Sequence, residues 1–326
     1  MPPEAASSVR AYWVNRPGAG AIETTPLPRR EGALRLKTLA TGVSPGTERL
    51  VGLGRVATGD YDAMRCAYME GAFSFPLKYG YALVGVDDAK QRAFVMHPHQ
   101  TMAVVDPDDT VPIPDAIPTM RALLFPALET AQNAIWDAEL DEGERVTVVG
   151  GGLIGVAIAY LLHKSQGTSI RLVEASGDRR EFLKRFAWLD VQAPDRNPDG
   201  TAPTCLFHCS ASESGLQWCI DHSAFEARVM ELSWYGDRRI RVALGSSFHY
   251  GRKRIISSQV AHVARPVRSR LGREGRRAAI LDHLADKRLD DFIGPVRDFS
   301  ELPALMDEIY RGSSTMMLPA IVYSGE

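Results

Sequence analysis

Apolar and polar positions follow two different patterns along the chain. Between residues 33 and 40, Leu34 and Leu36 alternate with Arg35 and Lys37, which is the period of a half-buried strand. Short apolar runs separated by glycine and proline continue through the first third of the chain, and this favours a compact, barrel-like β domain. From the middle of the chain onward, short β-branched runs alternate with longer apolar segments. That pattern predicts parallel strands joined by helices.

The expected elements follow from these patterns. In the first region we expect strands at 9–14, 33–40, 82–86, 92–96 and 101–105, a loop at 41–49 and a short helix within 60–70. A proline-rich link covers 106–118. Beyond it we expect a helix over 121–140 broken early by Pro126, strands at 146–149, 169–173, 204–210, 227–235 and 254–260, an amphipathic helix at 299–312 and a closing strand at 317–323.

A glycine-rich turn follows the strand at 146–149. Gly150, Gly152 and Gly155 form G-x-G-x-x-G, and an apolar helical segment, 156–162, comes next. In such a motif the first glycine makes the turn, the second lets backbone approach a pyrophosphate, and the third lets helix pack on strand. The free N–H groups of the helix N-terminus suit phosphate. The predicted cofactor-binding residues of this stretch are Gly150, Gly152, Leu153, Ile154 and Gly155. The alternative is a doubly wound domain whose crevice binds nothing.

The next strand ends in Glu174, about 20 residues after the last glycine, where an acid that binds the adenosine ribose is expected. Glu174 favours NAD, because a carboxylate repels the 2′-phosphate of NADP. Ser176, Arg179 and Arg180 follow closely and could hold that phosphate, or they could simply begin the next helix. We therefore expect NAD, with NADP possible, and include Arg179 among the cofactor-binding residues.

Composition narrows the class of protein. The chain of 326 residues is long enough for two domains. A formal net charge of −2 gives no reason to expect nucleic acid or an anionic membrane as partner. No apolar run approaches the ~20 residues of a membrane span, and the N-terminus lacks a signal-peptide core. The four cysteines are too few for a disulfide framework, so we expect a cytoplasmic protein with reduced thiols.

The order of these parts resembles the medium-chain dehydrogenase/reductase superfamily, which includes alcohol dehydrogenases and quinone oxidoreductases. The landmarks are Thr41-Gly-Val-Ser44, Gly80-Tyr-Ala-Leu-Val-Gly85, Val111-Pro-Ile-Pro114, the glycine turn and the final helix and strand. The resemblance implies an α/β protein with a GroES-like β-barrel domain at 1–120 with 290–326. It also implies a Rossmann dinucleotide-binding domain, a doubly wound parallel sheet, at 121–289.

Zinc-containing members of this superfamily place a cysteine, a histidine and a further cysteine or acid at three positions that here hold Ser44, Tyr81 and Glu129. One plausible ligand among three does not make a tetrahedral zinc site. The chain therefore resembles the zinc-free branch, and no zinc is expected. A zinc alcohol dehydrogenase with unusual ligands, such as Glu129 and His99, stays open. Cys205, His208 and Cys209 are interpreted as buried strand residues rather than ligands.

Without zinc, side chains must handle the proton that accompanies hydride transfer. The catalytic candidates are Ser44, Tyr81, His99 and Glu129. Two of them have a specific structural alternative: Tyr81 could be a packing aromatic, and Glu129 could pair with Arg49 or Arg121. His97 and His99 flank a proline, a position where most histidines are exposed or cap a strand.

The resemblance implies a zinc-independent, NAD(P)-dependent oxidoreductase acting on a small carbonyl, alcohol or enone substrate. By analogy with the family, Ser210, Ala211 and Ser212 reach the nicotinamide edge. The family also implies a homodimer formed through the edge strand at 254–260. The alternative from another class is a catalytically degenerate dinucleotide-binding sensor or scaffold. Substrate identity and reaction direction do not follow from the sequence.

Overall fold

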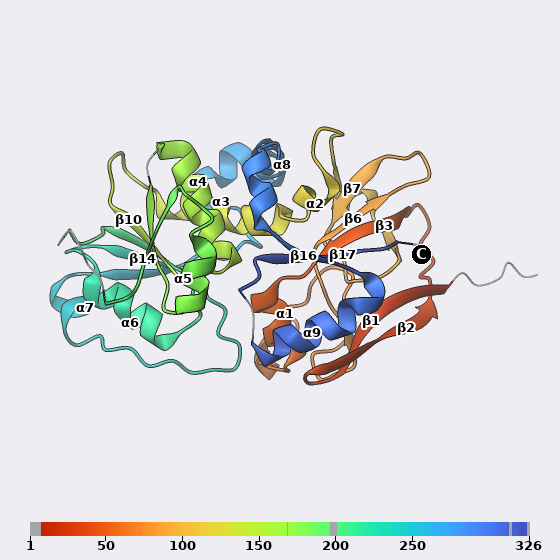
Figure 1. Cartoon of the computed structure of the whole chain (residues 1–326), viewed down its shortest axis with the longest axis horizontal. Coiled ribbons are helices and arrows are strands. Elements are labelled where there is room, and N and C mark those ends of the chain that lie inside the picture. Colours follow the sequence, from red (N-terminus) through yellow and green to blue (C-terminus); the bar gives the residue numbers. More distant parts are fainter. Residues whose placement is uncertain (1–7, 168, 196–200, 313–314, 325–326) are drawn as a thin grey trace, which may run out of the picture. The chain divides into compact units, whose positions relative to one another are not determined.

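The computed structural model describes residues 8–167, 169–195, 201–312 and 315–324. The chain divides into two compact units, residues 1–126 with 281–326 and residues 127–280 (Figure 1). We call them the β unit and the Rossmann unit. The predicted fold class, α/β with a GroES-like β domain and a Rossmann domain, is confirmed.

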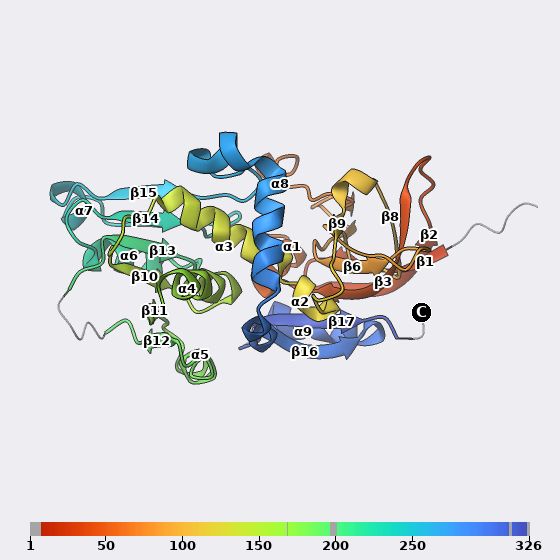
Figure 2. The same ribbon diagram turned by 90° about the horizontal axis from the view of Figure 1, so that it is seen from above.

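The Rossmann unit contains a parallel sheet of short buried strands. Its strands are β10 (Val146–Val149), β11 (Ile170–Val173), β12 (Leu189–Gln192), β13 (Cys205–His208), β14 (Arg228–Glu231) and β15 (Arg254–Ser257). They lie in the order β12-β11-β10-β13-β14-β15, which Figure 2 shows, and every neighbouring pair is parallel. Successive strands are added on one side of β10, as β11 and β12, and then on its other side, as β13, β14 and β15, so the switch point lies between β10 and β13. In doubly wound folds, ligands bind at the carboxyl ends of the strands beside such a switch point.

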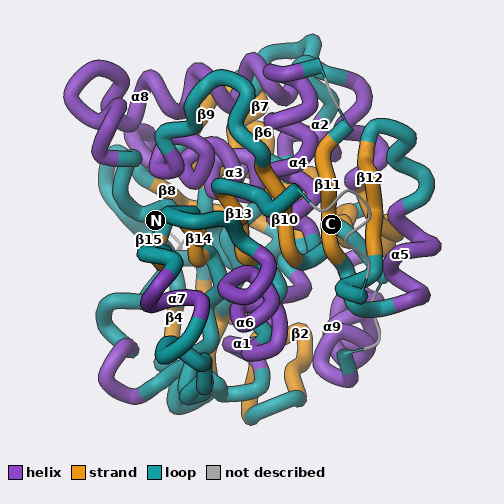
Figure 3. Tube along the Cα trace, turned by 90° about the vertical axis from the view of Figure 1, so that its left-hand side faces the viewer, coloured by secondary structure: helices purple, strands orange, loops and turns teal. Residues whose placement is uncertain are grey.

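The helices of this unit connect its parallel strands (Figure 3). They are α4 (Leu153–Gln166), α5 (Gly177–Leu183), α6 (Glu213–His222) and α7 (Ser247–Tyr250), while α3 (Phe125–Ala138) and α8 (Arg265–Leu284) contain the two points where the chain passes between units. Residues 156–162 of α4 are all buried, and the helix packs on β10 and β11. Gly167 ends α4 in the left-handed conformation.

The β unit is built from two sheets whose strands pair antiparallel, except that β16 and β17 are parallel. One has the order β2 (Ala19–Pro26), β1 (Ser8–Arg16), β5 (Leu77–Lys78) and β4 (Glu70–Gly71). The other has the order β16 (Ile293–Asp298), β17 (Leu318–Val322), β3 (Leu34–Gly42), β6 (Leu83–Val86), β7 (Arg92–Val95) and β9 (Val111–Pro112), and β8 (Met102–Val105) also pairs with β3. Because β17 pairs with β3, the C-terminal segment completes the sheet begun by the N-terminal one.

The helices of the β unit are α1 (Pro45–Gly52), α2 (Thr119–Ala122) and α9 (Leu302–Arg311), with short 3-10 turns at Thr58–Asp60, Pro107–Asp109, Lys287–Phe292 and Phe299–Glu301. The predicted amphipathic helix near the C-terminus is confirmed in α9. Its apolar stripe is buried at Leu302, Leu305, Met306 and Ile309.

Several local predictions were wrong. Residues 41–49 were expected to form a loop, yet α1 begins at Pro45, where proline's fixed φ suits the first turn. The expected helix within 60–70 is instead a series of turns that contains the positive φ of Tyr68. The predicted early break of the helix over 121–140 is present between α2, which ends at Ala122, and α3, which begins at Phe125 and has Pro126 in its first turn. Strands β2 and β16 and helix α8 were not anticipated.

No helix among the described residues is long and apolar enough to cross a membrane.

Candidate active site

The glycine turn joins β10 to α4 as the motif predicts. Gly150 has a φ of +109°, and a Cβ there would lie 2.7 Å from the Ser210 backbone nitrogen. A Cβ on Gly155 would lie 2.0 Å from the carbonyl oxygen of Gly150, so helix and turn touch through backbone atoms. A Cβ on Gly152 would meet no atom within 4 Å. The turn is therefore close-packed on the protein side and open at Gly152, which fits the approach of a pyrophosphate.

The N-terminus of α4 follows Gly152 directly. Leu153 and Ile154 lie in its first turn. Gly152 is the N-cap residue and has no side chain that could accept from their N–H groups. The first N–H groups of a helix have no partner within the helix and carry a partial positive charge. These two predicted residues therefore present backbone donors beside the open position, as phosphate binding requires.

Glu174 lies immediately after β11 and turns toward the glycine loop. Its Oε2 accepts from the Gly151 N–H at 2.8 Å, and its Oε1 accepts from the Ser176 N–H at 2.7 Å. Gly151, which the motif reading left out, must be small because a Cβ there would lie 2.5 Å from Leu183. The carboxylate is thus fixed on the β11 side of the switch point, where an adenosine ribose would bind.

Two arginines and a serine follow this acid. Arg179 donates to the Gly151 carbonyl at 3.4 Å, and burial lowers the pKa of its guanidinium while Glu174 raises it. Arg180 donates to the carbonyls of Glu174 and Ala175. Ser176 caps α5 by accepting from the Arg179 N–H. These contacts fit the alternative that Ser176 and Arg180 simply begin helix α5.

Ser210, Ala211 and Ser212 follow β13, on the other side of β10 from Glu174. All three are half-buried. Ala211 has a positive φ of 49°, and its N–H donates to the Ser233 hydroxyl at 3.1 Å. Ser212 caps α6 by accepting from the Gly215 N–H at 3.0 Å. The predicted residues thus stand at the carboxyl end of β13, beside the glycine turn.

In the β unit, Tyr81 is surrounded by hydroxyl groups. The side chains of Ser44 and Thr47, at the start of α1, hydrogen-bond its phenol. Burial raises the pKa of Tyr81 well above its usual value, and the two hydroxyls offset only part of that effect. Tyr81 therefore stays protonated near neutral pH and can donate a hydrogen bond or a proton.

A buried polar chain lies next to this group. The Ser44 N–H donates to Glu48 Oε1 at 2.7 Å, and Glu48 Oε2 lies 2.9 Å from His99 Nε2. His99 Nδ1 lies 2.7 Å from the Thr41 hydroxyl, which is 3.1 Å from the Tyr323 hydroxyl. His99 is fully buried and Glu48 is 4 % exposed. The chain connects Ser44 and His99, two of the predicted catalytic residues, through Glu48.

Sequence reasoning missed Glu48 and misjudged both histidines. His97 and His99 were expected to be exposed or to cap a strand, but both are buried. Burial lowers the pKa of His97 to about 3, against a smaller rise from its hydrogen bond to the Pro98 carbonyl. The signal for Glu48 was its place one turn after Ser44-Pro45, which a helix would bring back toward Ser44.

Glu129, the remaining catalytic candidate, belongs to the Rossmann unit. It pairs with Arg276 at 2.9 Å, and not with Arg49 or Arg121 as the alternative reading proposed. Arg121 instead pairs with Asp290. Burial raises the pKa of Glu129, and Arg276 opposes that rise. Its contacts are those of a structural ion pair.

The residues at the positions of a family zinc site do not fit the metal. Ser44 and Tyr81 supply hydroxyl groups and Glu129 is engaged by Arg276, whereas zinc prefers nitrogen and sulfur donors. No three histidine, cysteine or acidic side chains of the described residues gather as metal ligands. Cys205 and Cys219 are buried in the Rossmann unit, and burial raises the pKa of both thiols. His208 forms a hydrogen bond with Glu231.

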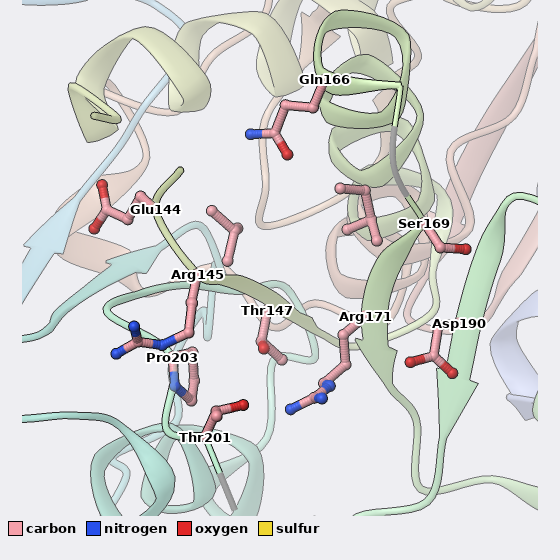
Figure 4. Close-up of a pocket in the computed structure, with 11 residues that line it drawn as sticks. Glu144, Arg145, Thr147, Gln166, Ser169, Arg171, Asp190, Thr201 and Pro203 are labelled. Carbon is pink, nitrogen blue, oxygen red and sulfur yellow. The ribbon is translucent and has the colours of Figure 1, made fainter. Parts of the chain in front are cut away.

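A pocket of about 360 Å³ opens at the opposite end of the Rossmann sheet (Figure 4). Its lining includes Arg145, Thr147, Arg171 and Asp190, near the amino ends of β10, β11 and β12. Doubly wound folds bind their ligands at the carboxyl ends. This pocket is therefore separate from the candidate cofactor site.

Solved structures share this fold over nearly the whole chain. An alcohol dehydrogenase of Escherichia coli CFT073, solved with NADH, has a TM-score of 0.76 at 16 % identity, covering 97 % of this chain and 100 % of that one. The 2R,3R-butanediol dehydrogenase of Bacillus subtilis has a TM-score of 0.76 at 14 % identity, covering 97 % and 99 %. A candidate zinc-binding dehydrogenase of Sinorhizobium meliloti 1021, bound to NADP, has a TM-score of 0.74 at 13 % identity, covering 97 % and 99 %.

No family model matches the chain, and no curated protein matches it in sequence. The structural likeness shows that the chain has the fold of the medium-chain dehydrogenase/reductases, as the sequence resemblance predicted. At these identities the likeness extends to the fold alone.

Proposed function

We propose that the chain is an NAD(P)-dependent oxidoreductase that transfers hydride to or from a small carbonyl, alcohol or enone without zinc. The observation that carries the proposal is the glycine turn. It is closed by backbone contact at Gly155, open at Gly152, and followed by an uncapped helix N-terminus and a fixed ribose-side acid at Glu174. The fold is shared with proteins solved with NADH and with NADP.

In this proposal the Rossmann unit binds the dinucleotide. The N–H groups of Leu153 and Ile154 bind the pyrophosphate, Glu174 binds the adenosine ribose, and Ser210 to Ser212 lie on the nicotinamide side. When bound, the nicotinamide donates or accepts the hydride. NAD is the preferred cofactor because the Glu174 carboxylate would repel a 2′-phosphate. NADP is the alternative if Arg179 leaves its carbonyl contact to bind that phosphate.

The β unit supplies the proton. Tyr81 is protonated at neutral pH and can donate to a developing alkoxide or enolate oxygen. Ser44 and Thr47 fix the direction of its phenol, and the Glu48–His99–Thr41 chain holds the start of α1 in place through the Ser44 N–H. Glu129 is assigned no catalytic step because Arg276 engages it.

Turnover on a panel of aldehydes, ketones and enones, with NADH and NADPH supplied separately, tests this proposal. Oxidation of reduced cofactor by any member, unaffected by a chelator, supports it. Tight dinucleotide binding without turnover would favour a binding module with no hydride chemistry, which is the second candidate function. Dependence of turnover on added zinc would contradict the zinc-free mechanism.

A further inference from the structure

A line of hydrogen-bonded side chains stands at the carboxyl ends of β13 and β14, and the proposed function leaves it unused. Glu231 Oε2 lies 2.8 Å from His208 Nδ1, and His208 Nε2 lies 2.7 Å from the Ser210 hydroxyl. The Ser210 hydroxyl lies 2.8 Å from that of Ser212. We call this series the Glu231–His208–Ser210 chain.

The sheet itself brings the acid and the imidazole together. His208 is the last residue of β13 and Glu231 the last of β14, and the two residues are direct partners in the parallel register. Neighbouring residues in register project from the same face of a sheet. His208 is fully buried, whereas the Glu231 side chain is 13 % exposed.

The Glu231 carboxylate is fully engaged. Besides His208, it accepts from the Ser233 N–H at 2.7 Å and from the Tyr235 hydroxyl at 3.2 Å. Burial alone would raise the pKa of Glu231, but the hydrogen bonds from His208 and Ser233 outweigh burial and lower it. Glu231 is therefore ionised near neutral pH and acts only as an acceptor.

With Glu231 as an acceptor, the hydrogen bonds of the Glu231–His208–Ser210 chain can all run in one direction. An ionised Glu231 accepts from His208 Nδ1, and Nε2 of a neutral ring then accepts from the Ser210 hydroxyl. Ser212 accepts from the Gly215 N–H, which leaves its own hydroxyl proton able to point to the Ser210 oxygen 2.8 Å away. The Ser210 oxygen thus has its own proton committed to His208 and keeps acceptor capacity for a further donor.

Ser210 stands where a dinucleotide would pass. Its backbone nitrogen is the closest atom to a Cβ built on Gly150 of the glycine turn, and it lies across β10 from Glu174. A dinucleotide with its adenosine ribose on Glu174 would cross the switch point toward β13. The half-buried Ser210 is then on its nicotinamide side.

We propose that His208 and Glu231 are positioning residues that hold the Ser210 hydroxyl as an acceptor for the carboxamide N–H of a bound nicotinamide nucleotide. This inference rests on the proposed function. The same three residue types also serve acyl transfer, but that chemistry needs N–H donors for an oxyanion beside the serine. Here the Ala211 N–H is taken by Ser233 and the Gly215 N–H by Ser212.

The test compares binding of NADH with binding of ADP-ribose, which lacks the nicotinamide, using NADH fluorescence and competition. Ser210→Ala should raise the Kd for NADH about fivefold, the effect of one hydrogen bond, and leave the Kd for ADP-ribose unchanged. His208→Gln should have the same selective effect. The double variant should bind NADH no more weakly than either single variant, because His208 acts through Ser210.

Ser223→Ala is the matched control, because it removes a buried hydroxyl just beyond the other end of α6; it should change neither Kd. If wild type binds NADH and Ser210→Ala binds it equally well, this inference is wrong while the proposed function stands. A parallel loss of NADH and ADP-ribose binding in Ser210→Ala would also overturn it. If wild type binds no dinucleotide, both this inference and the proposed function are wrong. Should His208→Gln not fold, Glu231→Gln takes its place, and wild-type NADH binding in that variant would overturn the positioning role.

Discussion

The glycine turn of the Rossmann unit and the Tyr81 region of the β unit are two different kinds of site. The first is made of backbone: contacts at Gly150 and Gly155, open space at Gly152 and free N–H groups on α4. The second is made of side chains, with a phenol among hydroxyls and a buried histidine–glutamate pair. A site made of backbone N–H groups binds a phosphate whatever molecule carries it. A site made of side chains can be adapted to a particular substrate by changing those side chains.

The largest expected effect separates chemistry from binding. Tyr81→Phe removes the proposed proton donor and should lower kcat by about 100-fold or more. The Kd for NADH should not change, because the cofactor residues belong to the other unit. Steady-state kinetics on a substrate found by the panel, with NADH titration of the same preparation, check both values. A wild-type kcat in this variant would show that Tyr81 is not the proton donor.

The second prediction separates the two roles within the glycine turn. Gly155→Ala places a Cβ against the Gly150 carbonyl and should lower the free energy of unfolding by about 3 kcal/mol, as overpacking does. Gly152→Ala meets open space, so its unfolding should match wild type while its Kd for NADH rises about tenfold. Urea unfolding and NADH titration of both variants measure this. Equal destabilisation by the two substitutions would contradict the division of roles.

Cofactor choice gives a smaller effect. Glu174→Gln keeps an oxygen for the Gly151 N–H but removes the charge, so the Kd ratio of NADPH to NADH should fall by about tenfold. Glu181→Gln, which alters an exposed pair with Lys184, serves as the control and should leave the ratio unchanged. An unaltered ratio in Glu174→Gln would show that another group decides between the two cofactors.

The last prediction concerns the stability of the β unit. The unfolded chain protonates His97 near pH 6.5, but the folded chain protonates it only near pH 3. Between these values the unfolded state binds more protons, so stability falls as pH falls, by at most about 1.4 kcal/mol per pH unit. Urea unfolding from pH 7 to pH 5 should show a shallower slope in His97→Gln. The same slope in both proteins would contradict the assignment.

The contrast between the two sites also explains what the sequence could predict. The glycine turn lies within one short segment, so its spacing indicated a dinucleotide-binding fold and singled out Glu174. Tyr81 and Ser44 came from alignment with a family landmark. The Glu48–His99–Thr41–Tyr323 chain joins three distant segments, because Thr41 and Glu48 belong to one of them, and no local pattern marks such a meeting.

His208 shows the same limit in the Rossmann unit. Its residue type suggested a metal ligand or a buried strand position, and only the register of β13 with β14 places it opposite Glu231. The pairing of Glu129 with Arg276 likewise depends on helices α3 and α8 meeting within that unit. Such contacts follow from tertiary packing rather than from sequence spacing.

Titration of the purified chain with NADH and NADPH, together with its metal content, tests the central claim most directly. We predict saturable NADH binding at one site per chain, weaker NADPH binding and no stoichiometric zinc. Absence of binding by either nucleotide would contradict a dinucleotide site at the glycine turn, and stoichiometric zinc would contradict the proton-donor role of Tyr81.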